Sequence, residues 1–249
     1  MMRTANPALN KKTFGNTGYI SNTENVMTLQ GTVNKTGFLL TFLILAAAWT
    51  WNLYFESSNP ASVTPWLIGG GLGGFVVAII TTFKKNLSPI TAPIYAVLEG
   101  LFLGSLSALF ESRFPGIVVQ AVGLTFGTLF ALLMAYRSGL IKATENFKLG
   151  VTAATGGICL LYLISFILSF FGTGIPYIHQ SGIIGIGFSM FVVVIAALNL
   201  VLDFDFIENA SENGAPKYME WYGAFGLLVT LVWLYIEILR LLSKLYSRN

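Results

Sequence analysis

The chain has 249 residues, of which 55% are hydrophobic and only 10% are charged, and its net charge is +3. A soluble globular protein carries about 25% charged residues, so this composition excludes an ordinary soluble domain. The small positive charge provides no footprint for binding nucleic acid. Cys159 is the single cysteine, which excludes an intrachain disulfide.

Charged residues are absent from several long stretches, as expected of membrane-spanning helices. A helix needs about 20 apolar residues to cross a bilayer core of about 30 Å. The uncharged stretch 149–202 is too long for one span, and the residues 172–176, Gly-Thr-Gly-Ile-Pro, divide it. Seven spans are therefore predicted, near residues 37–55, 66–83, 93–110, 116–136, 149–171, 182–207 and 220–242. The short alternating segments of a β-barrel are absent, so we expect an all-α polytopic membrane protein.

The first 35 residues are polar and rich in Asn, Thr and Gly. They predict a mobile, cytoplasmic N-terminal arm over residues 1–35, followed by a single seven-helix transmembrane domain over 36–249. No short apolar core precedes a small-residue cleavage site, so the first span itself is expected to direct membrane insertion.

The placement of Lys and Arg predicts the orientation of the spans. Cytoplasmic segments carry an excess of these residues near span ends, and ten of the fourteen lie on the side of the N-terminal arm. We therefore expect an integral multi-pass protein of a cell (inner) membrane, with its N-terminus in the cytoplasm. The compact chain and the plain N-terminal arm favour a bacterial membrane. A re-entrant last segment would bring the basic C-terminal tail inside as well. Trp221 to Arg240 is long enough to cross, which favours seven complete spans. The ten residues are Arg3, Lys11, Lys12, Lys35, Lys84, Lys85, Arg137, Lys142, Lys148 and Lys217.

Glycines recur four residues apart in two of the predicted spans. The run from Gly69 to Gly74 formally matches a GxGxxG dinucleotide motif, but no strand precedes it, which argues against a nucleotide site. Small residues at this spacing let helix backbones approach closely. The pairs Gly69/Gly73, Gly70/Gly74 and Gly123/Gly127 therefore predict helix packing.

Carboxylates interrupt the sixth predicted span, where an acid is costly and is usually retained for an ion, a proton or a fixed partner. Asp203 and Asp205 lie two residues apart, so a helix points them about 200° from each other and they cannot share one partner. Asp205 and Glu208 do share a face. The alternative is that Asp203 marks the cytoplasmic end of the span, with Asp205 and Glu208 in solvent. Asn199 adds a polar group one turn before Asp203.

Two further spans carry ionisable residues. Glu99 lies near the middle of the third span, beside a stripe of small residues, and is a candidate either for pH sensing or for a structural ion pair. Glu237 and Arg240 are three residues apart on one face of the last helix and are expected to pair. In the alternative arrangement, Arg240 reaches Glu99 on another helix.

Several kinds of chemistry have little support in the sequence. His179, in the loop after the fifth span, is the single histidine and cannot build a metal site on its own, although it could titrate. No Ser/His/Asp or Cys/His set with inward-facing helical spacing is present. We therefore expect a protein that is not an enzyme and needs no cofactor or resident metal.

Three segments together resemble a known family. They are residues 114–121, which open the fourth span, the acidic end of the sixth span over 202–208, and residues 234–242 of the last span. Their order and spacing are similar to those of the Bax inhibitor-1/YccA (TMBIM) family, and with the seven spans the resemblance covers roughly 35–245. It implies six helices wrapped around a central seventh. It also implies a calcium-selective leak controlled by pH, in which one aspartate on the sixth helix and one on the seventh share a proton.

The chain departs from that pattern at the second acid. Asp203, or less well Asp205, matches the acid of the sixth helix. Alignment on Arg240 places Thr230 where the second aspartate belongs, and a hydroxyl cannot share a proton in that way. We therefore hypothesise that Asp203 or Asp205 titrates alone or with Glu208, with Thr230 as a neutral hydrogen-bond partner.

The function expected from the sequence is a pH-sensitive calcium leak whose partners are the lipid bilayer, calcium ions and protons. The alternative is a non-channel interaction protein that modulates a membrane protease or a stress response, for which the arm over 1–35 would dock a membrane-protein partner. A proton-coupled carrier is a third interpretation, but no inverted repeat supports it.

Overall fold

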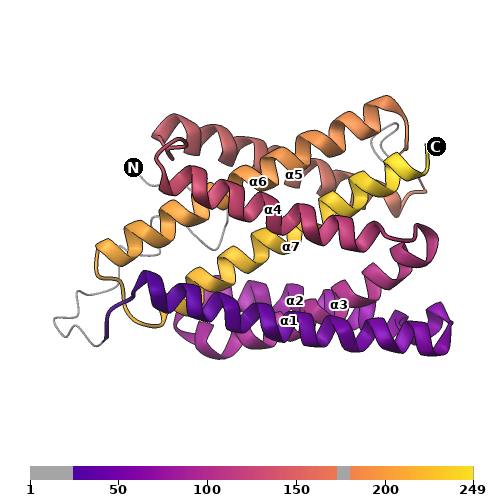
Figure 1. The fold of residues 1–249 in the computed structure, drawn as a ribbon, viewed down its shortest axis with the longest axis horizontal. Coiled ribbons are helices and arrows are strands. Elements are labelled where there is room, and N and C mark those ends of the chain that lie inside the picture. Colours follow the sequence, from indigo (N-terminus) through magenta and orange to yellow (C-terminus); the bar gives the residue numbers. More distant parts are fainter. Residues whose placement is uncertain (1–24, 173–179, 249) are drawn as a thin grey trace. The chain divides into compact units, whose positions relative to one another are not determined.

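The computed structural model describes residues 25–172 and 180–248. In these ranges it holds seven long helices, and the extended pairing is limited to one isolated bridge between Val26 and Pro216 (Figure 1). The helices are α1 (Leu29–Ser57), α2 (Thr64–Phe83), α3 (Ser88–Arg113), α4 (Ile117–Arg137), α5 (Glu145–Ser169), α6 (Ile183–Glu212) and α7 (Met219–Tyr246). All seven are long and apolar enough to cross a membrane, which confirms the all-α polytopic membrane fold.

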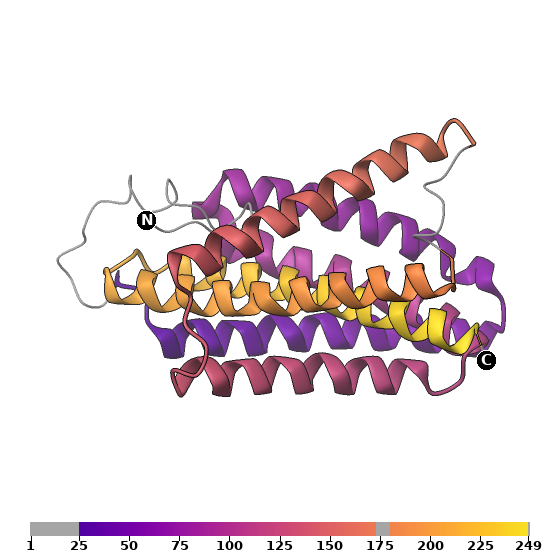
Figure 2. The ribbon, with the colours of Figure 1, turned by 90° about the horizontal axis from the view of Figure 1, so that it is seen from above.

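The last segment is one uninterrupted helix (Figure 2). The 28 residues of α7 extend about 42 Å at 1.5 Å per residue, which exceeds the thickness of a bilayer core. Of the seven spans, α7 also has the largest buried share. Its length favours a complete crossing over a re-entrant segment.

Helix α1 starts eight residues before the predicted first span, at Leu29 instead of residue 37. Thr28 caps it, because its side chain accepts a hydrogen bond from the backbone N–H of Gly31. The helix therefore includes residues 29–35 of the predicted arm, despite their polar composition. Residues 1–24 of the predicted arm, and His179, lie outside the described residues.

Proline and glycine mark several helix ends. Pro65 and Pro89 stand in the first turns of α2 and α3, where the missing N–H has no helical partner to lose. Gly139 and Gly214 follow α4 and α6 with positive φ angles of 74° and 67°, a conformation that terminates helices and favours glycine.

Contacts among the described residues group the helices into two units. The α1–α3 unit comprises Pro7–Pro115 with Asp205–Val229, and so holds α1 to α3, the end of α6 and the start of α7. The α4–α5 unit includes Gly116–Phe204 with Thr230–Asn249, and so holds α4, α5, most of α6 and the remainder of α7.

In the α1–α3 unit, α1 and α2 both pack against α3 (Figure 1). Glycine makes the approach of α2 possible, because a Cβ atom on Gly70 would lie 2.7 Å from the carbonyl oxygen of Leu98. The core of this unit includes Leu39 of α1, Tyr95 of α3 and Phe225 of α7.

In the α4–α5 unit, α5, α6 and α7 share a small apolar cluster that contains Ile158, Val192, Ile195 and Trp233. The Asn199 side-chain amide of α6 donates to the Thr155 hydroxyl of α5 at 2.8 Å. The helix packing predicted at Gly123 and Gly127 of α4 is not found among the described residues. A Cβ atom on either glycine would meet no described atom within 4 Å.

Candidate functional site

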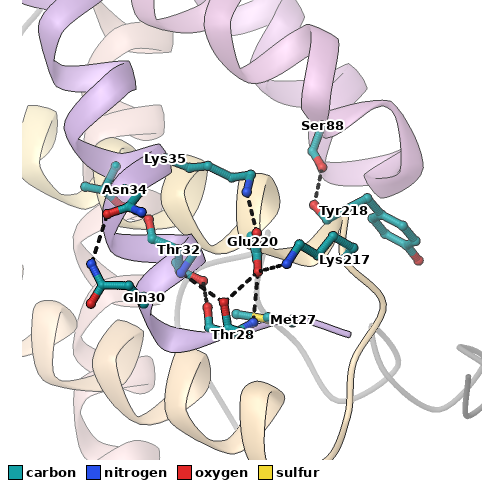
Figure 3. A network of polar contacts seen from close by, with 12 residues as sticks. Met27, Thr28, Gln30, Thr32, Asn34, Lys35, Ser88, Lys217, Tyr218 and Glu220 are labelled. Carbon is teal, nitrogen blue, oxygen red and sulfur yellow. Dashed lines mark hydrogen bonds and ion pairs between the residues drawn. The ribbon is translucent and has the colours of Figure 1, made fainter. Parts of the chain in front are cut away.

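In the α1–α3 unit, hydrogen bonds and ion pairs from three residues converge on Glu220, in the first turn of α7 (Figure 3). Its side chain is 0% exposed. One carboxylate oxygen accepts bonds from the Thr28 backbone N–H and hydroxyl, both at 2.9 Å, and lies 3.2 Å from the Lys217 ammonium. The other oxygen pairs with the Lys35 ammonium.

The sequence of α1 explains why Glu220 fits against it. Thr28, Gly31 and Lys35 follow one another at spacings of three and four residues, which places them on one face of the helix. The Thr28 hydroxyl accepts from the Gly31 N–H at 3.0 Å and donates to Glu220. A Cβ atom at position 31 would overlap the Glu220 carboxylate, so a larger residue there would force this side chain to move.

The electrostatics of this cluster favour a negative charge. The Glu220 carboxylate lies at the N-terminus of α1 and within the first turn of α7, and both helix dipoles stabilise an anion there. The Lys35 ammonium also makes a cation–π contact, since its nitrogen lies 5.5 Å from the centre of the Trp221 ring. Burial raises the pKa of the nearby Tyr218 phenol, which therefore stays uncharged at neutral pH.

Backbone hydrogen bonds hold the segment before α1 against the turn between α6 and α7. The Met27 N–H donates to the Ala215 carbonyl at 2.7 Å, and the Lys217 N–H donates to the Asn25 carbonyl at 2.9 Å. At the start of α3, the Ser88 hydroxyl donates to the Tyr218 carbonyl at 3.0 Å (Figure 3).

Sequence reasoning missed this cluster because it treated residues 1–35 as one polar arm. An acid in the first turn of the last span, three residues after Lys217, was the available signal.

The two acids of the sixth span differ in burial, as their two-residue spacing requires. Asp203 is 0% exposed, whereas Asp205 and Glu208 are half-buried. Because α6 continues to Glu212, Asp203 lies inside the helix and not at its end. The Asn199 side chain, one turn earlier, is also buried.

Thr230 belongs with Asp203 to the α4–α5 unit, and both side chains are buried, Thr230 being 3% exposed. Asp205, Glu208 and Glu99 belong to the α1–α3 unit. Of the predicted acids, Asp203 and Glu237 thus fall in the same unit as Thr230, whereas Asp205, Glu208 and Glu99 fall in the other unit.

Glu99 lies at the interface of α3 with α2. A Cβ atom on Gly74 of α2 would lie 3.0 Å from a carboxylate oxygen of Glu99. Tyr95, one turn earlier on α3, is its side-chain hydrogen-bond partner. The other carboxylate oxygen of Glu99 is buried without a hydrogen bond. The small residues that follow Glu99 serve a different interface, because Gly100 and Gly104 pack against α1.

Glu237 and Arg240 form an ion pair on α7, with 2.9 Å between Oε1 and Nη1. Tyr162 of α5 completes the group: its hydroxyl donates to Glu237 at 3.1 Å and accepts from Arg240 at 2.9 Å. Sequence reasoning had proposed Glu99 as the alternative partner of Arg240, but it did not identify Tyr162, which nothing in the local sequence distinguishes. These contacts fix the acid and the base to each other and to α5.

Among the described residues, no three His, Cys, Asp or Glu side chains are placed to hold a metal ion together.

Comparison with known proteins identifies the family. Neither a curated protein nor a solved structure matches the chain. A family model described as Bax inhibitor 1 like matches residues 6–247, which is nearly the whole chain. The match includes Asp203, Thr230 and Glu220, together with all seven helices. The chain therefore belongs to the Bax inhibitor 1-like family of membrane proteins.

Proposed function

We propose that this protein is a pH-sensitive calcium leak pathway in a bacterial cell (inner) membrane. The observation that carries the proposal is the complete burial of Asp203 within α6, a helix long enough to span the membrane. An ionisable side chain at membrane depth is costly to insert, and such residues commonly mark ion and proton pathways. The resemblance to a family with a pH-controlled calcium leak supports the same conclusion.

In this proposal Asp203 is the group whose protonation controls the leak. Thr230, buried in the same unit, supplies a neutral hydroxyl in place of the second aspartate. A single carboxyl group titrates in one step, whereas two coupled carboxyl groups titrate in two. The leak should therefore change with pH in one step centred on Asp203.

The test is calcium influx into liposomes that contain the purified full-length protein and an internal calcium dye, measured from acidic to neutral pH. Asp203→Asn removes the titration without changing the size of the side chain, so we expect the pH dependence of influx to flatten. Asp205→Asn makes the same chemical change two residues later, at a half-buried position, and should keep the wild-type profile. An unchanged profile for Asp203→Asn would contradict the proposed role.

A second candidate function is an interaction protein that acts on a membrane protease or a stress response. The bonds that join Met27 and Thr28 to Ala215 and Glu220 favour it, because they attach the end of the arm to α7. Deletion of residues 1–24 leaves these bonds in place and distinguishes the two functions. A leak pathway should keep its influx after the deletion, whereas regulation of a partner through the arm should be lost.

A further inference from the structure

We infer that Glu220 is a positioning residue for α7, and that its carboxylate clamps residues 25–35 onto the first turn of this helix. We call this set of contacts the N-terminal clamp: the Glu220 bonds to Thr28, Lys35 and Lys217, with the backbone bonds of Asn25 and Met27 to Lys217 and Ala215. Release of the clamp is expected to raise the calcium leak. The effect on the leak rests on the proposed function, whereas the attachment itself does not.

The geometry of Glu220 is specific to this attachment. A carboxylate removed from water needs several donors to compensate its lost hydration, and Glu220 has donors from α1, from the segment before α1 and from the turn before α7. Gly31 leaves room for its side chain, and any other residue there would displace it. Glu220 is thus the side chain of α7 that receives these donors at this end, and the backbone bonds of Met27 and Lys217 support the same attachment.

The attachment is also open to solvent at its edges. The side chain of Lys35 is 21% exposed and that of Lys217 is 49% exposed, although Glu220 is fully buried. Ions in solution or a charged partner of the arm can therefore compete for the two ammonium groups. A purely apolar contact would hold α7 without this sensitivity.

The clamp can influence the proposed leak pathway through α7 itself. The helix is continuous, and Thr230 follows Glu220 by ten residues, about 15 Å along the helix. If the clamped arrangement disfavours the conducting state, loss of the clamp shifts the population toward conduction. Coupling between two sites of a protein commonly changes an equilibrium by about fivefold or more.

The first experiment measures calcium influx into liposomes for Glu220→Gln. This variant keeps the acceptor for Thr28 but loses the charge that pairs with the two lysines, so influx should rise about fivefold or more over wild type. Lys35→Met should act in the same direction from the other side of the ion pair. Glu145→Gln is the matched control, because it also removes an acid from the first turn of a spanning helix. It should leave influx unchanged.

The second experiment locks the clamp covalently. Val26 and Pro216 face each other between two backbone hydrogen bonds, and in such pairs the Cα atoms lie about 4.5 Å apart, within reach of a disulfide. Val26→Cys and Pro216→Cys are combined with Cys159→Ser, so that the new pair holds the only thiols. Oxidation in the Glu220→Gln background should return influx to the parental level, and reduction should raise it again.

The outcomes separate the clamp from the proposed function. If the parent protein leaks but Glu220→Gln does not increase influx, or if the disulfide does not reverse the increase, control by the clamp is overturned. If the parent protein does not leak at any pH, the proposed function fails. The attachment is then tested by the rate at which the Val26→Cys and Pro216→Cys pair oxidises. Glu220→Gln should slow this reaction, and an unchanged rate would overturn the attachment.

Discussion

Among the described residues, three carboxylates are buried to within 2% exposure, and the groups around them bear on what each can do. Glu220 and Glu237 have basic partners at hydrogen-bonding distance, Lys35 and Lys217 for the first and Arg240 for the second. These acids are suited to holding helices in place. Asp203 is equally buried, and we propose for it the one role that depends on a change of protonation.

At the residue scale, Thr230→Asp tests the departure from the family pattern. The variant restores an acid at the position where the resemblance implies one, so two buried carboxyl groups would then compete for a proton. Coupled acids release their protons in two steps, and the pH profile of calcium influx should broaden into two phases. Thr230→Asn, which adds similar bulk without an acid, should keep a single phase. A single-phase profile for both variants would show that Thr230 is not near the titrating group.

A second prediction at this scale concerns the ion pair on α7. Arg240→Met removes the guanidinium that pairs with the buried Glu237 carboxylate, and such a loss costs about 1–3 kcal/mol in the free energy of unfolding. The double variant Glu237→Met/Arg240→Met removes the stranded charge, so it should be more stable than Arg240→Met alone. Denaturant unfolding in detergent micelles measures both differences. A double variant that is less stable than either single variant would argue against this account.

At the scale of elements, glycines decide which helices approach closely. Gly70 and Gly74 of α2 contact α3, and Gly100 and Gly104 of α3 contact α1, whereas Gly69 is open. Residues on one face of a helix recur every three or four positions, so two overlapping glycine pairs cannot serve the same interface equally. Gly70 lies against backbone atoms of Leu98 and Phe102, whereas Gly73 and Gly74 lie against the side chains of Leu98 and Glu99, so the pair that contains Gly70 forms the closer contact.

Gly70→Ala is therefore expected to destabilise the protein. The added methyl group would lie 2.7 Å from the Leu98 carbonyl oxygen and 2.9 Å from the Phe102 nitrogen, and neither backbone atom can move aside alone. Overpacking of this kind costs about 1–3 kcal/mol. Gly69→Ala is the matched control and should be neutral or slightly stabilising, because alanine favours the helix. Equal effects of the two substitutions on unfolding in detergent would contradict the assigned interface.

At the scale of the whole molecule, an odd number of spanning helices puts the two ends of the chain on opposite sides of the membrane. This arrangement holds if all seven helices, including α7, cross the membrane completely. The excess of basic residues on the N-terminal side predicts that this side faces the cytoplasm.

Single-cysteine labelling tests this topology. In a Cys159→Ser background, Ser247→Cys should react with an impermeant maleimide added to intact cells. Asn10→Cys should react only after the membrane is permeabilised. Because both variants carry the same reactive group, a difference in their labelling shows that the two sites face opposite sides of the membrane. Reaction of both sites from the same side would show that α7 is re-entrant.

The sequence alone determined the fold class, the number of spans and the family, because each depends on patterns that are local or repeated along the chain. Long uncharged stretches define the spans whatever their neighbours are, and the spacing of Asp203 and Asp205 already required that they point apart. Likewise, Glu237 and Arg240 lie one turn apart, so their pairing needed no tertiary information.

Only the tertiary structure decided where residues distant in sequence meet. The polar residues 29–35 are helical because Thr28 caps them and because Lys35 finds its partner 185 positions later, at Glu220. Tyr162 joins Glu237 and Arg240 for the same reason, since it comes from α5. A buried charge is stable only when its donors are assembled around it, and those donors come from separate helices that folding brings together.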